Sequence, residues 1–241
     1  MNYSTAEALQ LLQTGTVEME GYVPWGSNRT FLVSICLPES DAIQAIYKPQ
    51  QGERPLWDFP TGTLCLRERA AFLLSEALGW HIVPPTILRD GPRGWGSVQF
   101  FIEHDPEEHY FTFQHEYPDQ LKRIALFDIL INNADRKGGH VIRDEDNRLW
   151  AIDHGICFHH EYKLRSVIWD YAGEPIPSAL GAELDGLAAL LGDETTPLVE
   201  ALLTLLSRVE FTAVQKRLQH LRQTRQFITP GPGRHYPWPL V

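Results

Sequence analysis

The sequence predicts an α+β fold with two parts, a strand-rich first half and a mostly helical second half. Runs of β-branched and aromatic residues, separated by turn-forming residues, fill positions 17–47. From residue 118 onward, apolar residues instead recur at the three- and four-residue spacing of helices. The chain has 241 residues, which suffices for one large domain or two small lobes but not for several independent domains.

The first half begins with a short amphipathic helix within residues 1–15, for which Ser4 or Thr5 is a suitable N-cap. An antiparallel meander follows, because the segments between its apolar runs are rich in Pro, Gly, Ser and Asn. The expected strands span residues 17–23, 30–37, 42–47, 86–88 and 97–103, and a helix is expected over 64–80. The resulting order is helix, three strands, helix, two strands.

The second half opens with a strongly apolar helix and continues with short strands and further helices. The expected helices span residues 118–132, 179–191, 198–206 and 212–227, and a short hairpin joins 140–142 to 149–152. The segment between the hairpin and about residue 177 shows neither the apolar spacing of a helix nor the alternation of a strand, so we expect it to be irregular. Four prolines predict an extended tail over 229–241.

Composition excludes several classes of function. The net charge is −10, from 21 basic and 31 acidic residues, so we expect no nucleic-acid partner and no stable association with anionic membranes. No apolar run approaches the roughly 20 residues that cross a bilayer, and the N-terminus lacks the basic region of a signal peptide. Three distant cysteines form no CxxC pair, which is typical of a reducing compartment. We therefore expect a cytoplasmic protein.

Four charged side chains occur along the chain in the order in which kinases carry the groups for phosphoryl transfer. Lys48, one of only five lysines, ends a predicted strand, and Glu68 lies on the following helix. Kinases use this arrangement to hold a lysine against nucleotide phosphates. Asp135 opens a polar loop and Asp153 ends the hairpin, and such transfer needs one carboxylate to orient the attacking hydroxyl and another to hold magnesium. Each aspartate alone would be interpreted as an ordinary turn residue, so the prediction depends on the ordered set.

A turn between the first two strands, Gly26-Ser27-Asn28, is a further candidate. Such a turn exposes backbone N–H groups that can cradle a phosphate, although any hairpin could carry this sequence.

These residues carry a resemblance to a known superfamily. Residues 127–140 (FDILINNADRKGGH), followed by AIDHG at 151–155, resemble the catalytic core of atypical kinases, in particular the phosphatidylinositol 3-/4-kinase-like and HipA-like groups. Residues 67–74 and the sequence VPPT at 83–86 look like the same superfamily. More narrowly, the whole chain looks like a bacterial family of phosphatidylinositol-kinase-like proteins, with good order from about residue 17 to 175.

The resemblance implies a two-lobed protein-kinase-like fold, with a small N-lobe of antiparallel sheet and one helix and a mostly helical C-lobe. The chain would then be a single kinase-like domain, with an N-lobe over residues 1–103, a C-lobe over 104–228 and an extended tail over 229–241.

The resemblance also implies a role for each candidate residue. Asp135 would be the catalytic aspartate, and Glu68 would orient Lys48 toward the α- and β-phosphates of ATP. Nucleotide contacts would come from Gly26, Ser27 and Asn28 over the phosphates, from Lys48, and from Gln99, Phe101 and Ile102 in the hinge beside adenine. Asp153 and His140 would hold Mg²⁺ or Mn²⁺, Asp128 and Asn133 would brace the catalytic loop, and Lys137 would touch the transferring phosphate.

His140 departs from the superfamily pattern, which has asparagine at this position. An imidazole is a poorer ligand for hard Mg²⁺ than an amide oxygen and suits Mn²⁺ or softer metals better. The narrower bacterial family resembles this chain in carrying the histidine, so we interpret it as a variation. It nevertheless leaves catalytic competence open.

The resemblance therefore predicts an ATP-dependent phosphotransferase that acts on a hydroxyl of a soluble metabolite or a protein. Two alternatives stay open, a nucleotide-binding pseudokinase acting through a partner and a nucleotidyl transferase. Lipid kinases use a basic loop to hold anionic headgroups, whereas the segment after Asp153 offers only Lys163 and Arg165. We therefore predict that a phosphoinositide is not the acceptor.

Overall fold

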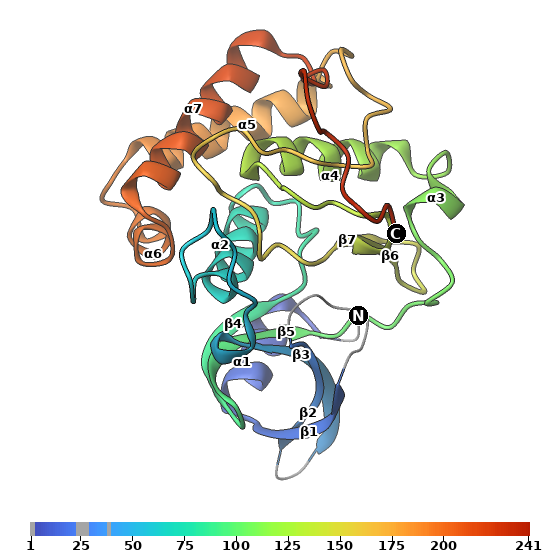
Figure 1. Cartoon of the computed structure of the whole chain (residues 1–241), viewed down its shortest axis with the longest axis vertical. Coiled ribbons are helices and arrows are strands. Elements are labelled where there is room, and N and C mark those ends of the chain that lie inside the picture. The colour runs from blue at the N-terminus through green and yellow to red at the C-terminus, as the bar shows by residue number, and fades with distance from the viewer. Residues whose placement is uncertain (1–2, 23–28, 38–39) are drawn as a thin grey trace.

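The computed structural model describes residues 3–22, 29–37 and 40–241, and Figure 1 shows two lobes stacked along the long axis. The smaller lobe contains a five-stranded sheet in the order β1-β2-β3-β5-β4, in which every neighbouring pair is antiparallel. Its strands are β1 (Thr16–Tyr22), β2 (Phe31–Leu37), β3 (Ser40–Pro49), β4 (Thr86–Gly91) and β5 (Gly94–Phe100).

The sheet curls around α1 (Thr5–Thr14), which lies inside the ring that the strands form in Figure 1. Alternate side chains of β3, including Ala45 and Tyr47, pack with Leu12 of α1 in this inner core. Because side chains alternate across a strand, Gln44 and Lys48 lie on the opposite face of β3. This second face of the sheet is the one turned toward the larger lobe, and it carries the candidate lysine.

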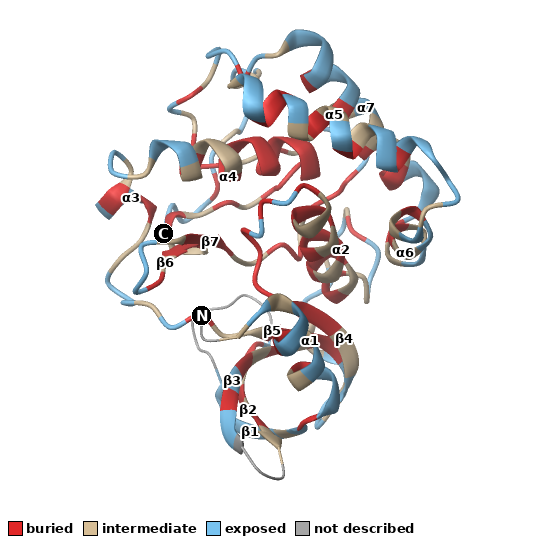
Figure 2. Ribbon diagram, turned by 180° about the vertical axis from the view of Figure 1, so that it is seen from behind, coloured by how far each residue is buried: buried red, intermediate tan, exposed pale blue. Residues whose placement is uncertain are grey.

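Helix α2 (Leu64–Ala77) lies between the sheet and the larger lobe, and Figure 2 shows it largely buried. Unlike a surface helix, it buries charged as well as apolar residues. Arg67 and Glu68 are 1% and 2% exposed. Charged side chains are this deeply enclosed only when they are paired, so both must find partners outside the helix.

The larger lobe is built around α4 (Pro118–Ile131), whose second half is almost entirely buried in Figure 2. The other elements of this lobe are α3 (Tyr110–Phe113), the hairpin of β6 (Val141–Arg143) and β7 (Leu149–Ala151), α5 (Ser178–Gly192), α6 (Pro197–Leu205) and α7 (Arg208–Thr224). One continuous apolar core joins α2, α4, α5, α6 and α7. The elements that carry the candidate site residues are therefore anchored on one packed body.

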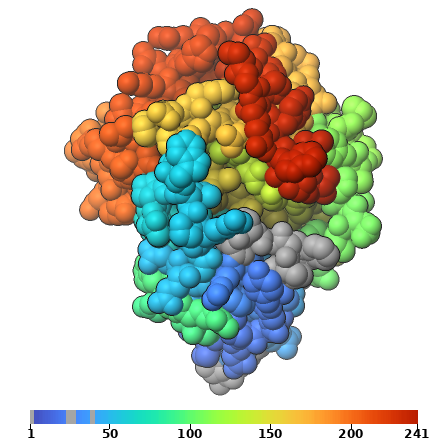
Figure 3. Space-filling view, viewed as in Figure 1, coloured from blue at the N-terminus to red at the C-terminus, as the bar shows by residue number. Residues whose placement is uncertain are grey.

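The last residues of the chain form neither helix nor strand. Figure 3 shows this terminal segment, in red, lying on the surface of the larger lobe. Its backbone accepts hydrogen bonds from two loops of that lobe, at 3.1 Å from Ser166 N to His235 O and at 2.7 Å from Gly138 N to Leu240 O.

The two-lobed α+β fold predicted from the sequence is confirmed, and the main differences lie in element boundaries. Strand β5 begins at Gly94, three residues before the expected start, and forms a tight hairpin with β4. The glycines of this stretch disfavour a strand by propensity. The fold nevertheless needs one of them, because a Cβ at Gly96 would lie 2.4 Å from the carbonyl oxygen of Lys48. The short helix α3 was not predicted.

Within the described ranges 3–22, 29–37 and 40–241, every helix is too short or too polar to cross a membrane.

Candidate active site

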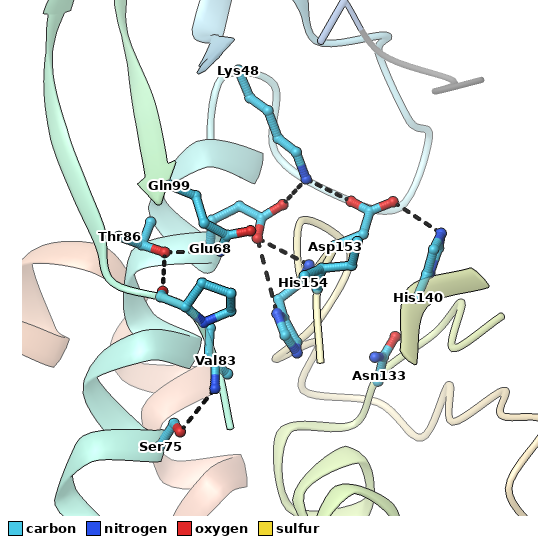
Figure 4. Close-up of polar contacts among 12 residues, drawn as sticks. Lys48, Glu68, Ser75, Val83, Thr86, Gln99, Asn133, His140, Asp153 and His154 are labelled. Atoms are coloured by element: carbon cyan, nitrogen blue, oxygen red, sulfur yellow. Dashed lines mark hydrogen bonds and ion pairs between the residues drawn. The ribbon is translucent and has the colours of Figure 1, made fainter. Parts of the chain in front are cut away.

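Lys48 is the centre of an ion-paired group between the lobes (Figure 4). Its Nζ lies 2.5 Å from Glu68 Oε1 and 2.9 Å from Asp153 Oδ1. Burial by itself would lower the pKa of Lys48, but the carboxylates of Asp153 and Glu68 outweigh it and raise that pKa above its ordinary value. The lysine is therefore a fixed cation. It is carried by β3, and its two carboxylate partners are carried by α2 and by the segment after β7.

Glu68 is the buried member of this group, with a side chain 3% exposed. Oε1 accepts from Lys48, and Oε2 accepts the backbone N–H of His154 at 3.0 Å. Burial raises the pKa of Glu68, and Lys48 and the His154 amide act against that shift. The carboxylate thus depends on these two donors for its charge, and it connects α2 to the strand lysine and to the loop that follows Asp153.

Asp153 faces His140 on its other side, with 3.3 Å between Asp153 Oδ2 and His140 Nε2 (Figure 4). The backbone of Asp153 has φ of 60°, a left-handed conformation that is uncommon for residues other than glycine. Burial raises and Lys48 lowers the pKa of Asp153, and the net effect is a pKa below the usual value. Asp153 therefore presents an ionised carboxylate with one oxygen toward Lys48 and the other toward His140.

The tautomer of His140 follows from its hydrogen bond to the backbone. Nδ1 lies 3.0 Å from the carbonyl oxygen of Asp135, which can only accept, so Nδ1 carries the proton. Burial lowers the pKa of His140 to about 4, which leaves Nε2 as a lone pair near neutral pH. This lone pair and the Asp153 carboxylate oxygen face each other, an arrangement that a cation between them would stabilise.

These two donors fit a divalent metal of the kind that kinases use. Among the residues that the structure describes, no three His, Cys, Asp or Glu side chains form a complete metal-binding group. Mg²⁺ and related ions are commonly held by only one or two protein ligands, and phosphate and water oxygens supply the rest. His140 Nε2 and Asp153 Oδ2 are suited to that role.

Asp135 lies beside this group on the polar loop of residues 133–139 that follows α4, the predicted catalytic loop. Its Oδ2 is 2.9 Å from Lys137 Nζ, and its backbone N–H donates to Asn133 Oδ1 at 3.0 Å. Burial raises the pKa of Asp135, and Lys137 lowers it in part. With its side chain 23% exposed, Asp135 is accessible to another molecule while its position is fixed through Asn133.

A buried network supports the loop from behind. Asp128 on α4 accepts from Arg136 Nε at 2.9 Å and from Asn133 Nδ2 at 2.9 Å. Arg136 is fully buried, and its Nη1 donates to the carbonyl oxygens of His140 and Ile152. Asp128 and Asn133, predicted to brace the loop, thus lie together and are joined by Arg136, for which no role was predicted. The sequence signal for such a role was the position of Arg136 directly after Asp135.

Residues 101 and 102, which were predicted to form the hinge, lie beside a cavity of about 960 Å³. Phe101 and Ile102 line it, as does Gln44 from the same face of β3 as Lys48. A smaller space borders Lys48, Glu68 and Asp153 themselves. Gln99 lines neither space, and its amide donates to Thr86 Oγ1 at 2.8 Å.

Gly26, Ser27 and Asn28, predicted to cover the phosphates, lie outside the described residues.

The sequence of this chain is similar to one family model over part of its length and to one bacterial protein over nearly all of it. A sequence model of the family Phosphatidylinositol 3- and 4-kinase matches residues 90–184. Protein Rv2133c of Mycobacterium tuberculosis is 38% identical, and the match covers 95% of this chain and 94% of that protein. Phosphatidylinositol 4-kinase gamma 4 of Oryza sativa is 27% identical over 53% of this chain. The match spans only 26% of that plant protein's length.

Solved structures show the same architecture at low sequence identity. The Golgi casein kinase with Mn/ADP bound superposes with a TM-score of 0.60 at 16% identity, covering 91% of this chain and 74% of that one. Hydra Fam20 with sugar gives a TM-score of 0.60 at 14% identity, with coverages of 92% and 89%. These likenesses establish a kinase-like fold, and the near full-length match to the mycobacterial protein shows that the chain belongs to the bacterial family of phosphatidylinositol 3-/4-kinase-like proteins that includes Rv2133c.

Proposed function

We propose that the protein is an ATP-dependent phosphotransferase that transfers phosphate to a hydroxyl of a soluble metabolite or a protein. One observation carries the proposal. Lys48, Glu68, Asp153 and His140, which come from four separate segments, form one connected group, and Asp135 is joined to it through the His140 ring. This set matches the parts that hold and transfer a nucleotide phosphate in kinases.

In this proposal the larger cavity beside Phe101 and Ile102 receives the adenine side of ATP, and Lys48 binds its phosphates. Gln99 has its amide engaged with Thr86, so it shapes the wall behind the hinge in place of contacting adenine directly. Gly26, Ser27 and Asn28 remain the candidate cover over the phosphates.

Asp153 and His140 would hold Mg²⁺ or Mn²⁺, and the solved Golgi casein kinase, which contains Mn and ADP, has this fold. When bound, the metal would neutralise charge on the phosphate oxygens.

The residues of the chain then have distinct tasks around the acceptor. Asp135 orients the attacking hydroxyl and accepts its proton, because its carboxylate is accessible beside Lys137 and its backbone N–H is held by Asn133. Lys137, 2.9 Å from Asp135 Oδ2, is close enough to follow the transferring phosphate. Asp128 and Arg136 keep the loop rigid from the α4 side.

The acceptor proposed here is not a phosphoinositide. Lys163 is one of two basic side chains on the segment after Asp153, and its Nζ lies 2.9 Å from Asp58 Oδ2 with the side chain 10% exposed. A cation that is already paired and nearly buried offers little attraction to an anionic headgroup. Phosphatidylinositol vesicles should therefore stay unphosphorylated, and robust labelling of them would contradict this choice of acceptor.

The test is phosphate transfer from ATP labelled at the α- or γ-phosphate, with Mg²⁺ and with Mn²⁺, against metabolite and protein acceptors. We expect γ-label transfer by the wild type and a loss of about 100-fold or more in Asp135→Asn with ATP still bound. Lys48→Met should bind ATP more weakly and lose transfer. Lys122→Met, on a surface lysine paired with Glu174, serves as the matched control.

Other outcomes separate the alternatives. ATP binding without transfer of either label, together with unchanged cellular function of Asp135→Asn, favours a pseudokinase, to which His140 points. Transfer of α-label favours a nucleotidyl transferase. Absence of any nucleotide binding contradicts all three.

A further inference from the structure

His154 occupies a fully buried position between the catalytic loop and α2. Figure 4 shows its ring beneath the Glu68 carboxylate, directly after Asp153 in the chain. On the far side, its Nε2 lies 2.9 Å from Arg136 Nη2. A guanidinium can only donate, so Nε2 is the acceptor and the neutral ring carries its proton on Nδ1.

The proton on Nδ1 has no hydrogen-bond partner, although the atom is buried. The nearest carboxylate oxygen is Glu68 Oε2, at 4.0 Å. That oxygen already accepts the backbone N–H of the same histidine at 3.0 Å. Buried donors are nearly always paired, so an unpaired one aimed at a buried carboxylate calls for an explanation.

Nucleotide binding would change the balance of charge at this point. Lys48 is shared here between Glu68 and Asp153. Phosphates bound at Lys48 would share its positive charge, so the buried Glu68 carboxylate, although still paired with the lysine, would lose part of its compensation. A carboxylate in such a place needs another donor to remain ionised and in position.

We propose that His154 is a positioning residue, whose Nδ1–H moves into hydrogen-bonding distance of Glu68 when phosphates bind Lys48. Because Nε2 of the same ring is bound to Arg136, this movement couples the catalytic loop to the strand lysine. This inference rests on the proposed nucleotide binding. The distance to be closed is short, since a hydrogen bond requires roughly 1 Å less than the 4.0 Å observed.

Packing alone does not account for a histidine here. The ring makes an edge-to-face contact with Phe127 at 5.8 Å between centroids, which a phenylalanine at 154 would also make. Substitutions can test the roles of the two ring nitrogens separately, because the amide of an asparagine would lie near the position of Nδ1 and the amide of a glutamine near that of Nε2. Asparagine thus keeps a donor for Glu68, whereas glutamine keeps an acceptor for Arg136.

The experiment compares binding of ATP and adenosine by calorimetry, with Mg²⁺ present. The dissociation constant of adenosine divided by that of ATP isolates the contribution of the phosphates, and a lower ratio means that the phosphates contribute less. We expect His154→Gln and His154→Phe to lower this ratio about tenfold, the size of one hydrogen bond to a charged group. Adenosine binding should change less than about twofold, and His154→Asn should retain most of the wild-type ratio.

The same substitutions in a Lys48→Met background provide the decisive control. If His154 acts through Glu68 on Lys48, its effect on the ratio disappears there. A ratio unchanged in a folded His154→Gln protein, or an equal change in both backgrounds, overturns the inference and leaves the proposed function standing. A wild type that binds adenosine and ATP equally, or neither, contradicts the proposed phosphate binding itself. If His154→Phe does not fold, His154→Gln still decides, because it keeps the bond to Arg136.

Discussion

His140 lies where the resemblance to atypical kinases predicts an asparagine, and its surroundings specify how it can act. The Asp135 carbonyl fixes the proton on Nδ1, so Nε2 is turned toward Asp153 as a neutral donor atom. Histidines that bind metals commonly have their second nitrogen held in this way by a carbonyl or carboxylate. In the proposed metal site, a histidine in place of the asparagine therefore changes the chemical type of one ligand, and the Asp135 carbonyl keeps that ligand turned toward Asp153.

The expected consequence is a change in metal preference. His140→Asn should weaken Mn²⁺ binding in the presence of ADP by about tenfold, while Mg²⁺ binding weakens less or improves, because an amide oxygen is a harder ligand. Free Mn²⁺ measured by electron paramagnetic resonance, with Mg²⁺ as competitor, gives both constants. His81→Asn, at an exposed histidine paired with Glu76, is the control. Equal changes for the two metals would argue against His140 as a ligand.

At this scale the sequence revealed some side chains and not others. Lys48, Glu68, Asp135 and Asp153 could be selected because kinases carry such residues in this order along the chain. The structure brings the lysine into contact with two of the carboxylates, and the third, Asp135, is linked to them through the His140 ring. Arg136 and His154 could not be assigned in the same way. Their importance comes from contacts that exist only in the folded chain, of Arg136 with Asp128 on α4 and of His154 with Glu68 on α2. From sequence alone, a buried arginine cannot be told from an exposed one.

Among the elements, α4 does the most to shape the catalytic loop. It ends at Asn132, whose φ of 55° turns the chain out of the helix. The Asn132 amide then donates to the carbonyls of His159 and Glu161 and accepts from Lys163 N. One C-cap therefore both starts the catalytic loop and fixes the segment that follows Asp153. Sequence periodicity located the helix end within one residue but gave no sign of this second role.

The terminal segment supports the same loop from outside. Leu240 O accepts from Gly138 N at 2.7 Å, and His235 O accepts from Ser166 N and, at 3.1 Å, from Trp169 Nε1. The side chain of Val241 also lies over Gly138, at 3.4 Å from the position of a Cβ there. The segment was predicted only as an extended tail, because prolines indicate conformation and not where a chain docks.

Removal of residues 234–241 should therefore expose specific backbone amides. We expect faster hydrogen exchange at Gly138 and Ser166, because both lose their acceptors. The amide of Ala134 provides an internal control, since it donates to Ile156 and not to the terminal segment. Exchange resolved to single residues by NMR is the measurement. Unchanged protection at Gly138 and Ser166 would mean that the segment does not hold this position in solution.

On the scale of the whole molecule, α2 ties the lobes together through a buried ion pair. Arg67 Nη2 lies 2.5 Å from Glu210 Oε1 at the start of α7, with side chains 1% and 8% exposed. Arg67 also donates to the carbonyl of Cys157, while Glu210 closes a capping box with Ser207. Burial raises the pKa of Glu210, but Arg67 and Ser207 outweigh it and hold that pKa below its usual value. Because Glu68 follows Arg67, this pair also fixes the helix that presents Glu68 to Lys48.

Breaking one side of the pair should be costly. Arg67→Met leaves a buried carboxylate without its partner, and we expect a loss of about 3–5 kcal/mol in the free energy of unfolding, measured by urea denaturation. Glu210→Gln removes the charge but keeps the capping box, so the double variant Arg67→Met/Glu210→Gln should recover part of that loss. Arg208→Met, beside Glu194 on the exposed start of α7, should cost less than about 1 kcal/mol and serves as the control.

The same pair predicts a pH dependence with a definite sign. The pKa of Glu210 is lower in the folded state than in the unfolded one, so its contribution is fully present above about pH 4.5 and is lost as the pH falls through the folded pKa. Wild-type stability should thus decline below about pH 4.5, and Glu210→Gln should decline less steeply over that interval. Urea midpoints measured between pH 3 and 7 for both proteins test this. Parallel curves would show that the carboxylate does not depend on Arg67 for its charge, and the proposed tie between α2 and α7 would then have to come from apolar packing alone.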